Sequence, residues 1–279
     1  MENFEILGNK DFLVNIYRRG AYIGQITFDG QKILKETEDN NELHGGMPIL
    51  IPYGDLVKDA RYRFNGKTYY LPKNAYSEGN ATDSIHGMVR SQNWSVVERG
   101  EDYISLITDI SDPGYPTNLR VNVIYEVKDT TFKTDIKLSN FGENEAPAVA
   151  GAHPYFIIDQ QWKLYHSDKI QRLNYPDGVY PDGKLMDYDF NDIDEPWKLN
   201  LDDSFVGGGI LKLESKASKI ILNRNNMDYF EVYNGVYAGQ NSVAIEPLSG
   251  AINAFNNGIG LKTIKPGKTM ECGFAISID

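Results

Sequence analysis

The sequence predicts an all-β protein, built as a large antiparallel β-sandwich. Apolar and polar residues alternate along many short segments, as in 22–28 and 119–127, which is the period of a strand with one buried face. No window of a dozen residues carries the apolar stripe of an amphipathic helix. Turn signals such as Asn65-Gly66 and Asn257-Gly258 separate the segments. Roughly fifteen to twenty short strands without a repeat period favour a sandwich over a propeller or a solenoid.

The expected strands can be followed along the chain by this alternation. After 22–28 come 103–110, 119–127, 132–138, 210–213, 219–222, 229–233, 242–246 and 270–278. Two stretches break the pattern: 72–85 is polar and rich in small residues, and 157–204 mixes Asp, Tyr, Pro and Gly. Both are expected to be long ordered loops, which commonly carry function in compact domains. No Gly/Ser or Pro tract marks a boundary, so we expect residues 1–279 to form a single domain.

Composition and charge exclude several classes of protein. The chain has 279 residues, of which 41% are hydrophobic and 24% charged, as in ordinary folded proteins. Because 39 acidic residues outnumber 28 basic ones, the formal net charge is -11, and we expect neither nucleic acid nor an anionic membrane as a partner. No segment approaches the roughly 18 apolar residues that cross a bilayer. Residues 1–5 lack the basic and apolar regions of a leader, so we expect a cytoplasmic protein.

Four histidines, at 44, 86, 153 and 166, are candidate acids, bases or ligands near neutral pH. His153 follows a run of small residues, 150–152, which leaves open space, and precedes Pro154, Tyr155 and Phe156. The proline favours an extended backbone at His153, and the two aromatic rings can form a wall. A structural histidine under an aromatic cluster is the alternative that the local sequence leaves open.

Glu246 is built into the sequence in a similar way. In the segment 242–247 strand alternation puts Ala244 and Glu246 on one face, and Pro247 follows the glutamate. A surface glutamate at a strand end is the alternative. If the fold brings Glu246 and His153 together, they form a competent base and acid, with ordinary pKa values of about 4.3 and about 6.5.

A third candidate is the block His86-Gly87-x-x-Arg90. Its glycine permits close approach of the backbone to a ligand, while His86 and Arg90 supply donors to hydroxyls or anionic oxygens. A turn histidine with a solvated arginine is the alternative. The sequence has no H-x-H, H-E-x-x-H or C-x-x-C spacing and no G-x-S-x-G elbow, so we expect neither a metal ion nor a serine nucleophile.

Several blocks in order resemble the aldose 1-epimerase (galactose mutarotase-like) family. They are the segment 45–52, Gly66-Lys67-Thr68-Tyr69, His86-Gly87-x-x-Arg90, His153-Pro154-Tyr155-Phe156, and Glu246-Pro247 with 253–256. Their order and spacing extend over nearly the whole chain. The likeness is closest to the branch that carries G-G-x-P and H-G-x-x-R.

This resemblance implies a large β-sandwich called a supersandwich, a sugar bound in an open cleft on one sheet, and no cofactor. It implies that His153 is the general acid and Glu246 the general base. His86 and Arg90 match substrate-binding positions. Asp202 resembles an aspartate that contacts sugar hydroxyls, with Asp203 as the alternative if the loop is offset by one residue.

One family feature is missing from this chain. The Asn-Arg pair that usually follows the proline falls near Asp55-Leu56. Arg61 is therefore expected to substitute as the substrate-side arginine, with Arg63 as its alternative. A triplet at His44-Gly45-Gly46 imitates the histidine-glycine motif at the wrong place, so we expect the binding histidine at His86.

The resemblance implies an aldose 1-epimerase, or mutarotase, which interconverts the α and β anomers of a hexose or related sugar by acid/base ring opening and closure. The alternatives are a non-catalytic carbohydrate-binding or sugar-sensing protein of the same fold, a hexose-6-phosphate epimerase, and a glycoside hydrolase that uses Asp202 with Glu246. The expected partner is a small-molecule sugar. Its identity, its phosphorylation and the oligomeric state are left open.

Overall fold

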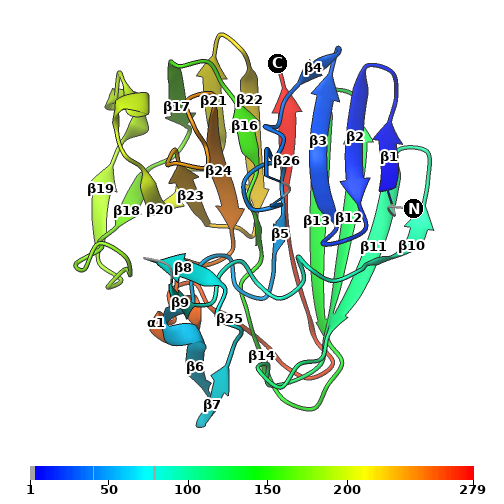
Figure 1. Ribbon diagram of the computed structural model, residues 1–279, viewed down its shortest axis with the longest axis vertical. Helices are drawn as coiled ribbons and strands as arrows, with labels where there is room; N and C mark the ends of the chain where they lie inside the picture. The colour runs from blue at the N-terminus through cyan, green and yellow to red at the C-terminus, as the bar shows by residue number, and fades with distance from the viewer. Residues whose placement is uncertain (1–3, 40, 78–79) are drawn as a thin grey trace.

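The structure is a computed structural model that describes residues 4–39, 41–77 and 80–279 (Figure 1). The expectation that residues 1–5 are not a leader falls partly outside the described residues, because residues 1–3 are not among them. Strands dominate the described chain and pair in antiparallel sheets, which confirms the all-β prediction. Its helices are single short turns: η1 (Lys58–Ala60), η2 (Phe190–Asp192), η3 (Pro196–Lys198) and α1 (Ala254–Asn257). None of these helices is long and apolar enough to cross a membrane.

The chain begins in a four-stranded sheet and then builds the first large sheet. The four strands are β1 (Phe4–Gly8), β2 (Phe12–Tyr17), β3 (Tyr22–Phe28) and β4 (Gln31–Lys32), in this order. The first large sheet has the order β10 (Ser95–Arg99), β11 (Tyr103–Ile110), β12 (Leu119–Lys128), β13 (Thr131–Asn140), β26 (Thr269–Ile278), β22 (Lys219–Asn225), β21 (Leu211–Ser215) and β17 (Trp162–His166). The C-terminal strand β26 therefore lies in the middle of this sheet (Figure 1).

The second large sheet carries the candidate site. Its order is β19 (Leu185–Tyr188), β18 (Ile170–Leu173), β20 (Asp202–Gly207), β23 (Tyr229–Tyr233), β24 (Ser242–Leu248), β15 (Gly151–Ala152) and β5 (Ile49–Leu50), and β16 (Tyr155–Ile157) also pairs with β24. Three two-stranded ladders complete the fold: β6 (Arg61–Phe64) with β7 (Lys67–Tyr70), β8 (Ala75–Ser77) with β9 (Asn80–Asp83), and β14 (Ala146–Ala148) with β25 (Lys262–Ile264). The hairpins β6–β7 and β8–β9 lie with α1 below the large sheets (Figure 1).

Alternating burial produces the core, as the sequence pattern predicts. Along β12 every second residue from Leu119 to Val127 is buried, while the residues between them are partly or fully exposed. Strand β24 differs because all of its residues are buried, on both faces of the sheet. A charged residue is rarely buried without a partner. Glu246 of β24 therefore needs a structural or chemical explanation.

Local turn chemistry also follows the sequence. The dipeptide Asn65-Gly66 joins β6 to β7, and both residues have positive φ, 46° and 80°. Two left-handed residues in a two-residue hairpin define a type I′ turn, which matches the twist of the flanking strands.

The prediction of two long loops is wrong. The segment 72–85 contains the hairpin β8–β9, although its residues 78–79 lie outside the described residues. The segment 157–204 contains β17, β18, β19, η2 and η3, as well as the start of β20. Strands of three to five residues span too few alternation periods to stand out from their turns.

Candidate active site

One face of the second large sheet gathers the candidate residues. Residues directly opposite each other in antiparallel strands point to the same face. The register pairs Asp202 with Tyr233, Ser204 with Glu231, Glu231 with Glu246, Tyr233 with Ala244, and Ala244 with Tyr155. His153 lies two residues before Tyr155, in the link between β15 and β16. The alternation that puts Ala244 and Glu246 on one face therefore extends across four strands.

His153 and Glu246 meet in this face, although 92 residues lie between them in the chain. His153 Nε2 lies 3.0 Å from Glu246 Oε1. Both residues are buried, with exposed fractions of 5% and 2%. The His153 ring stacks on Tyr155, with ring centroids 4.5 Å apart and planes 21° apart. Glu246 Oε2 is buried without a hydrogen-bond partner among the described residues, so this oxygen keeps an unused capacity to accept a hydrogen bond.

Burial shifts both members of this pair away from their ordinary pKa values. Loss of solvent raises the pKa of Glu246 well above its usual value, and the nearby charges of Asp55 and Asp202 raise it further. Loss of solvent also lowers the pKa of His153 well below its usual value. The expectation of ordinary pKa values is therefore wrong. The contact favours a net-neutral pair that holds one proton between an imidazole and a carboxyl group.

His86 lies against His153 in an edge-to-face arrangement with ring centroids 5.3 Å apart. Its Nδ1 donates a hydrogen bond to the Gly54 carbonyl over 3.0 Å, so Nε2 of the neutral ring is an acceptor. Burial lowers the pKa of His86 to about 4. The His86-Gly87 dipeptide has positive φ at both residues, and a Cβ on Gly87 would clash with the Ile51 backbone. The glycine thus accommodates the chain itself, whereas we expected it to accommodate a ligand.

Arg90 lies near His86 and is paired with an acid. Arg90 Nη1 donates to Glu42 Oε1 over 2.9 Å. Its positive charge contributes to lowering the pKa of His86. Arg90 therefore ties the chain after His86 to Glu42 and acts on His86 through its charge.

The strand register separates Asp202 from Asp203. Asp202 shares the face of Glu231 and Glu246 across the strands β20, β23 and β24. Loss of solvent raises the pKa of Asp202. Asp203 points to the opposite face, where Arg172 Nη2 donates to its Oδ1 over 2.6 Å. Of the two alternatives, Asp202 lies beside the histidine and glutamate pair.

The structure does not bring Arg61 and its alternative Arg63 into this cluster. Both lie in the hairpin β6–β7 and are exposed, and the Arg61 guanidinium lies 3.6 Å from Asp59. The nearby Lys58 lies over the ring of Tyr180 at 4.6 Å from its centroid. Each of Arg61, Lys58 and Arg90 thus has a partner of its own on the protein.

The sequence analysis did not identify two acidic residues of the site. Glu231 faces Glu246 across the β23–β24 ladder and is 3% exposed. Asp55, in the segment between β5 and η1, is also buried, and its charge adds to the loss of solvent that raises the pKa of Glu231. Asp55 stands where the family pattern led us to expect an Asn-Arg pair, and that mismatch was the available signal. Glu231 gives no signal beyond an acid in an apolar strand, 229–233.

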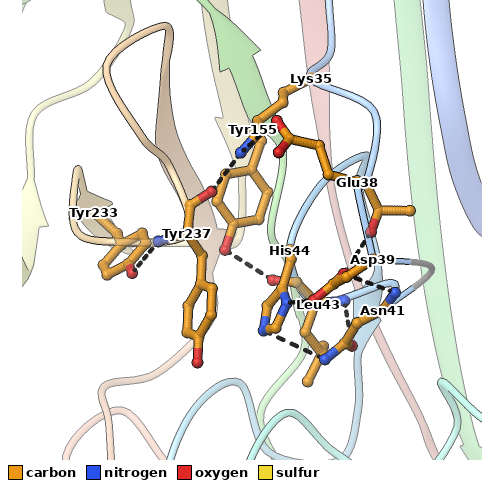
Figure 2. Close-up of polar contacts among 10 residues, drawn as sticks. Lys35, Glu38, Asp39, Asn41, Leu43, His44, Tyr155, Tyr233 and Tyr237 are labelled. Carbon is orange, nitrogen blue, oxygen red and sulfur yellow. Dashed lines mark hydrogen bonds and ion pairs between the residues drawn. The ribbon is translucent and has the colours of Figure 1, made fainter.

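The segments 35–39 and 41–44 make polar contacts beside Tyr155 and Tyr237 (Figure 2). The Tyr155 hydroxyl donates to the Leu43 carbonyl over 2.8 Å. The His44 ring stacks on Tyr237 at 3.7 Å, and its Nδ1 lies 2.6 Å from Asp39 Oδ2. Lys35 donates to the Tyr237 carbonyl over 2.7 Å. These contacts hold two loops together beside Tyr155, and they explain the His44-Gly45-Gly46 triplet as part of this loop contact.

The arrangement offers acid/base chemistry rather than metal coordination. In the described ranges, no group of three or more His, Cys, Asp or Glu side chains has a geometry that could hold a metal ion. A buried imidazole and a buried carboxyl group in contact can give one proton and take another on neighbouring atoms of a ligand.

Comparison with known proteins agrees with this fold. A model of the family described as aldose 1-epimerase matches residues 4–277. The chain is 25% identical over 293 residues to the Escherichia coli K12 protein YihR, described as uncharacterized, covering 95% of this chain and 90% of YihR. It is also 25% identical over 126 residues to the aldose 1-epimerase of Escherichia coli K12, covering 43% of this chain and 35% of that protein.

A solved structure extends the likeness to the whole fold. A putative aldose 1-epimerase from Escherichia coli K12 superposes with a TM-score of 0.84 at 18% identity, covering 100% of this chain and 99% of that chain. This likeness supports the galactose mutarotase-like sandwich, and the family match extends over nearly all of the sequence. The chain therefore belongs to the aldose 1-epimerase family.

Proposed function

We propose that this protein is an active aldose 1-epimerase that interconverts the α and β anomers of a free hexose or a closely related sugar. The observation that carries the proposal is the buried contact of 3.0 Å between His153 Nε2 and Glu246 Oε1. The ring oxygen and the anomeric hydroxyl of a pyranose are bonded to the same carbon. A donor and an acceptor that act on both must therefore lie within a few ångström of each other.

The proposed reaction moves one proton in and one proton out. His153, in its protonated form, donates to the ring oxygen while Glu246 accepts the proton of the anomeric hydroxyl, and the bond from C1 to the ring oxygen opens to the aldehyde. Rotation about the bond from C1 to C2 presents the other face of the carbonyl. The roles then reverse, and the ring closes with the opposite configuration at C1.

The one proton held by His153 and Glu246 is sufficient for both ring opening and ring closure. An imidazolium with a carboxylate and an imidazole with a carboxylic acid are two arrangements of the same proton, and each contains one acid and one base. Glu246 Oε2, which is buried without a partner among the described residues, offers an acceptor to the incoming hydroxyl. Burial removes water that would compete for these protons.

We propose His86, Arg90 and Asp202 as the residues that bind the sugar. His86 keeps Nε2 as an acceptor because Nδ1 donates to Gly54. Asp202 faces Glu231 and Glu246 from β20. Arg61 is left out of the proposed binding set because it is exposed and paired with Asp59.

The experiment that tests this function is anomer-exchange spectroscopy across a panel of free and 6-phosphorylated hexoses. We expect exchange between anomers to accelerate for free hexoses, and His153→Asn to abolish nearly all of the acceleration. Glu271→Gln serves as a control, because Glu271 is an exposed partner of Lys137 in the other large sheet.

The alternatives give different results in the same assay. Sugar binding without faster exchange identifies a binding protein, and it contradicts the proposed activity. Exchange confined to 6-phosphorylated sugars identifies a hexose-6-phosphate epimerase. Release of reducing ends from a disaccharide identifies a hydrolase.

A further inference from the structure

The loop between β23 and β24, residues 234–241, is anchored on the aromatic side chains that surround His153. Its Ala238 is buried and packs in one hydrophobic cluster with Tyr155. Its Gly235 lies against the Tyr233 ring, because a Cβ at this position would come within 2.5 Å of the ring carbon Cε2. Glycine therefore allows the loop to turn tightly over Tyr233.

Tyr237 in this loop has one supported ring face and one open ring face. Its backbone N–H donates to the Tyr233 hydroxyl over 3.1 Å, and its carbonyl accepts from Lys35 Nζ over 2.7 Å. The His44 ring stacks on it, with ring centroids 3.7 Å apart and planes 8° apart. Figure 2 shows Tyr237 between Tyr233 and His44. Because Tyr237 is 51% exposed although His44 covers one face, the other face is accessible.

The His44 ring is itself held at both nitrogens. Nδ1 lies 2.6 Å from Asp39 Oδ2, and Nε2 lies 3.3 Å from the Asn41 amide nitrogen. Because the Leu43 N–H donates to Asn41 Oδ1, the amide nitrogen of Asn41 is the donor toward Nε2. Both nitrogens of His44 are thus occupied by the protein, and its ring is a flat support for Tyr237. We call the Tyr237 ring, backed by the His44 ring, the aromatic platform.

The aromatic platform is connected to the proposed acid from two sides. On one side, the Tyr233 ring lies edge-on to His153, with centroids 6.3 Å apart and planes 69° apart. On the other side, the Tyr155 ring stacks on His153, and its hydroxyl donates to the carbonyl of Leu43, the neighbour of His44 in the chain. The platform is therefore separated from His153 by a single tyrosine on one side.

We propose that the aromatic platform binds substrate, with a C–H face of a neutral hexose packed against the open face of Tyr237. The inference rests on the proposed function and adds a binding residue to it. Aromatic faces carry negative potential, and the hydrogens of C–H groups beside oxygen are electron-poor, so the two surfaces attract each other. Since His153 and Glu246 act at C1 and the ring oxygen, the platform contacts the part of the sugar away from C1.

The charges beside the platform favour a neutral sugar. Lys35, the cation nearest to Tyr237 in sequence-distant contact, already donates to the Tyr237 carbonyl and lies 3.9 Å from Glu38. Asp39 holds the His44 ring from behind. A phosphorylated end of a sugar would meet these carboxylates without a free cation from this group, whereas an uncharged C–H face has no such repulsion.

Steady-state anomer exchange separates binding by Tyr237 from a structural role around His153. Tyr237→Ala should raise KM about three- to tenfold and leave kcat within about twofold, because a contact made equally with substrate and transition state changes KM alone. Tyr237→Phe should keep the wild-type KM, since the ring makes the contact. The matched control is Phe141→Ala, which removes an aromatic ring of similar exposure, 52%, directly after β13 in the other large sheet, and should change neither constant.

Sugar binding without turnover gives a second test that does not depend on activity. The Glu246→Gln protein is titrated with D-glucose and with D-galactose, and the dissociation constant is measured by saturation-transfer NMR. We expect Tyr237→Ala in this background to raise the dissociation constant by the same three- to tenfold. Near-ultraviolet circular dichroism establishes that each variant is folded.

The outcomes distinguish this inference from the proposed function. An unchanged KM in Tyr237→Ala overturns the inference, and so does a loss confined to kcat, which would make Tyr237 a structural neighbour of His153. An equal dissociation constant with and without the Tyr237 ring, or no binding of either sugar to the Glu246→Gln protein, also overturns it. If the wild type exchanges no anomers but sugar binding depends on Tyr237, the proposed activity falls and the binding surface stands.

Discussion

Replacement of Glu246 by glutamine is the sharpest perturbation of the proposed mechanism. The amide keeps the shape of the side chain and a donor or acceptor toward His153 Nε2, which lies 3.0 Å from Glu246 Oε1. It cannot take the proton of the anomeric hydroxyl. Glu246→Gln therefore removes the base and leaves the packing of β24 in place.

The expected effects on rate and on stability have opposite signs. A positioned general base contributes about 10²–10⁴-fold, so kcat should fall by this factor, which corresponds to a rise of about 3–5 kcal/mol in the activation free energy. Glu246 is 2% exposed, and burial among acidic neighbours raises its pKa, which means that its charged form is destabilised in the folded protein. The glutamine variant should therefore be at least as stable as the wild type near neutral pH.

Polarimetry of a freshly dissolved sugar measures the rate, and urea unfolding measures the stability. The matched control is Glu271→Gln, at an exposed ion pair with Lys137, which should change neither quantity appreciably. A Glu246→Gln protein that keeps a rate within about tenfold of the wild type would refute the assignment of the base. A large loss of stability would instead show that the carboxyl group is a structural element of β24.

Further predictions follow from other residues of the site. His86 has a folded-state pKa of about 4, below its ordinary 6.5, so the wild type should lose stability as the pH falls from 6.5 to about 4; His86→Gln should remove this loss in urea midpoints measured across the range. For Asp55 the pH dependence has the opposite sign, because its pKa is raised from 3.8 to about 7: the unfolding free energy should fall as the pH rises through this range. If the unfolding free energy of Asp55→Asn has the same slope against pH as the wild type, this prediction is contradicted. Tyr155→Phe removes the hydrogen bond to the Leu43 carbonyl and should cost about 1 kcal/mol by thermal unfolding. Arg61→Ala should change the unfolding free energy by less than about 0.5 kcal/mol and leave KM unchanged, and a large rise in KM would place this exposed side chain at the substrate.

The architecture could be predicted because it depends on local patterns. The alternation in 119–127 appears directly as the buried face of β12, and Asn65-Gly66 forms the expected hairpin turn. The short strands within 157–204 could not be predicted, because each spans fewer than three alternation periods and depends on pairing with distant strands such as β20 and β21.

By itself, the sequence determined the strand class and identified His153, His86 and Glu246 as candidates, since small neighbours, a following proline and family motifs are local features. Only the tertiary structure decided that His153 meets Glu246, that Asp202 rather than Asp203 shares their face, and that Asp55 and Glu231 join them. Register between strands far apart in the chain sets these contacts, and a shift of one residue would reverse every side chain. Burial then changes the proton affinities of the groups that meet, and no stretch of sequence encodes the loss of solvent.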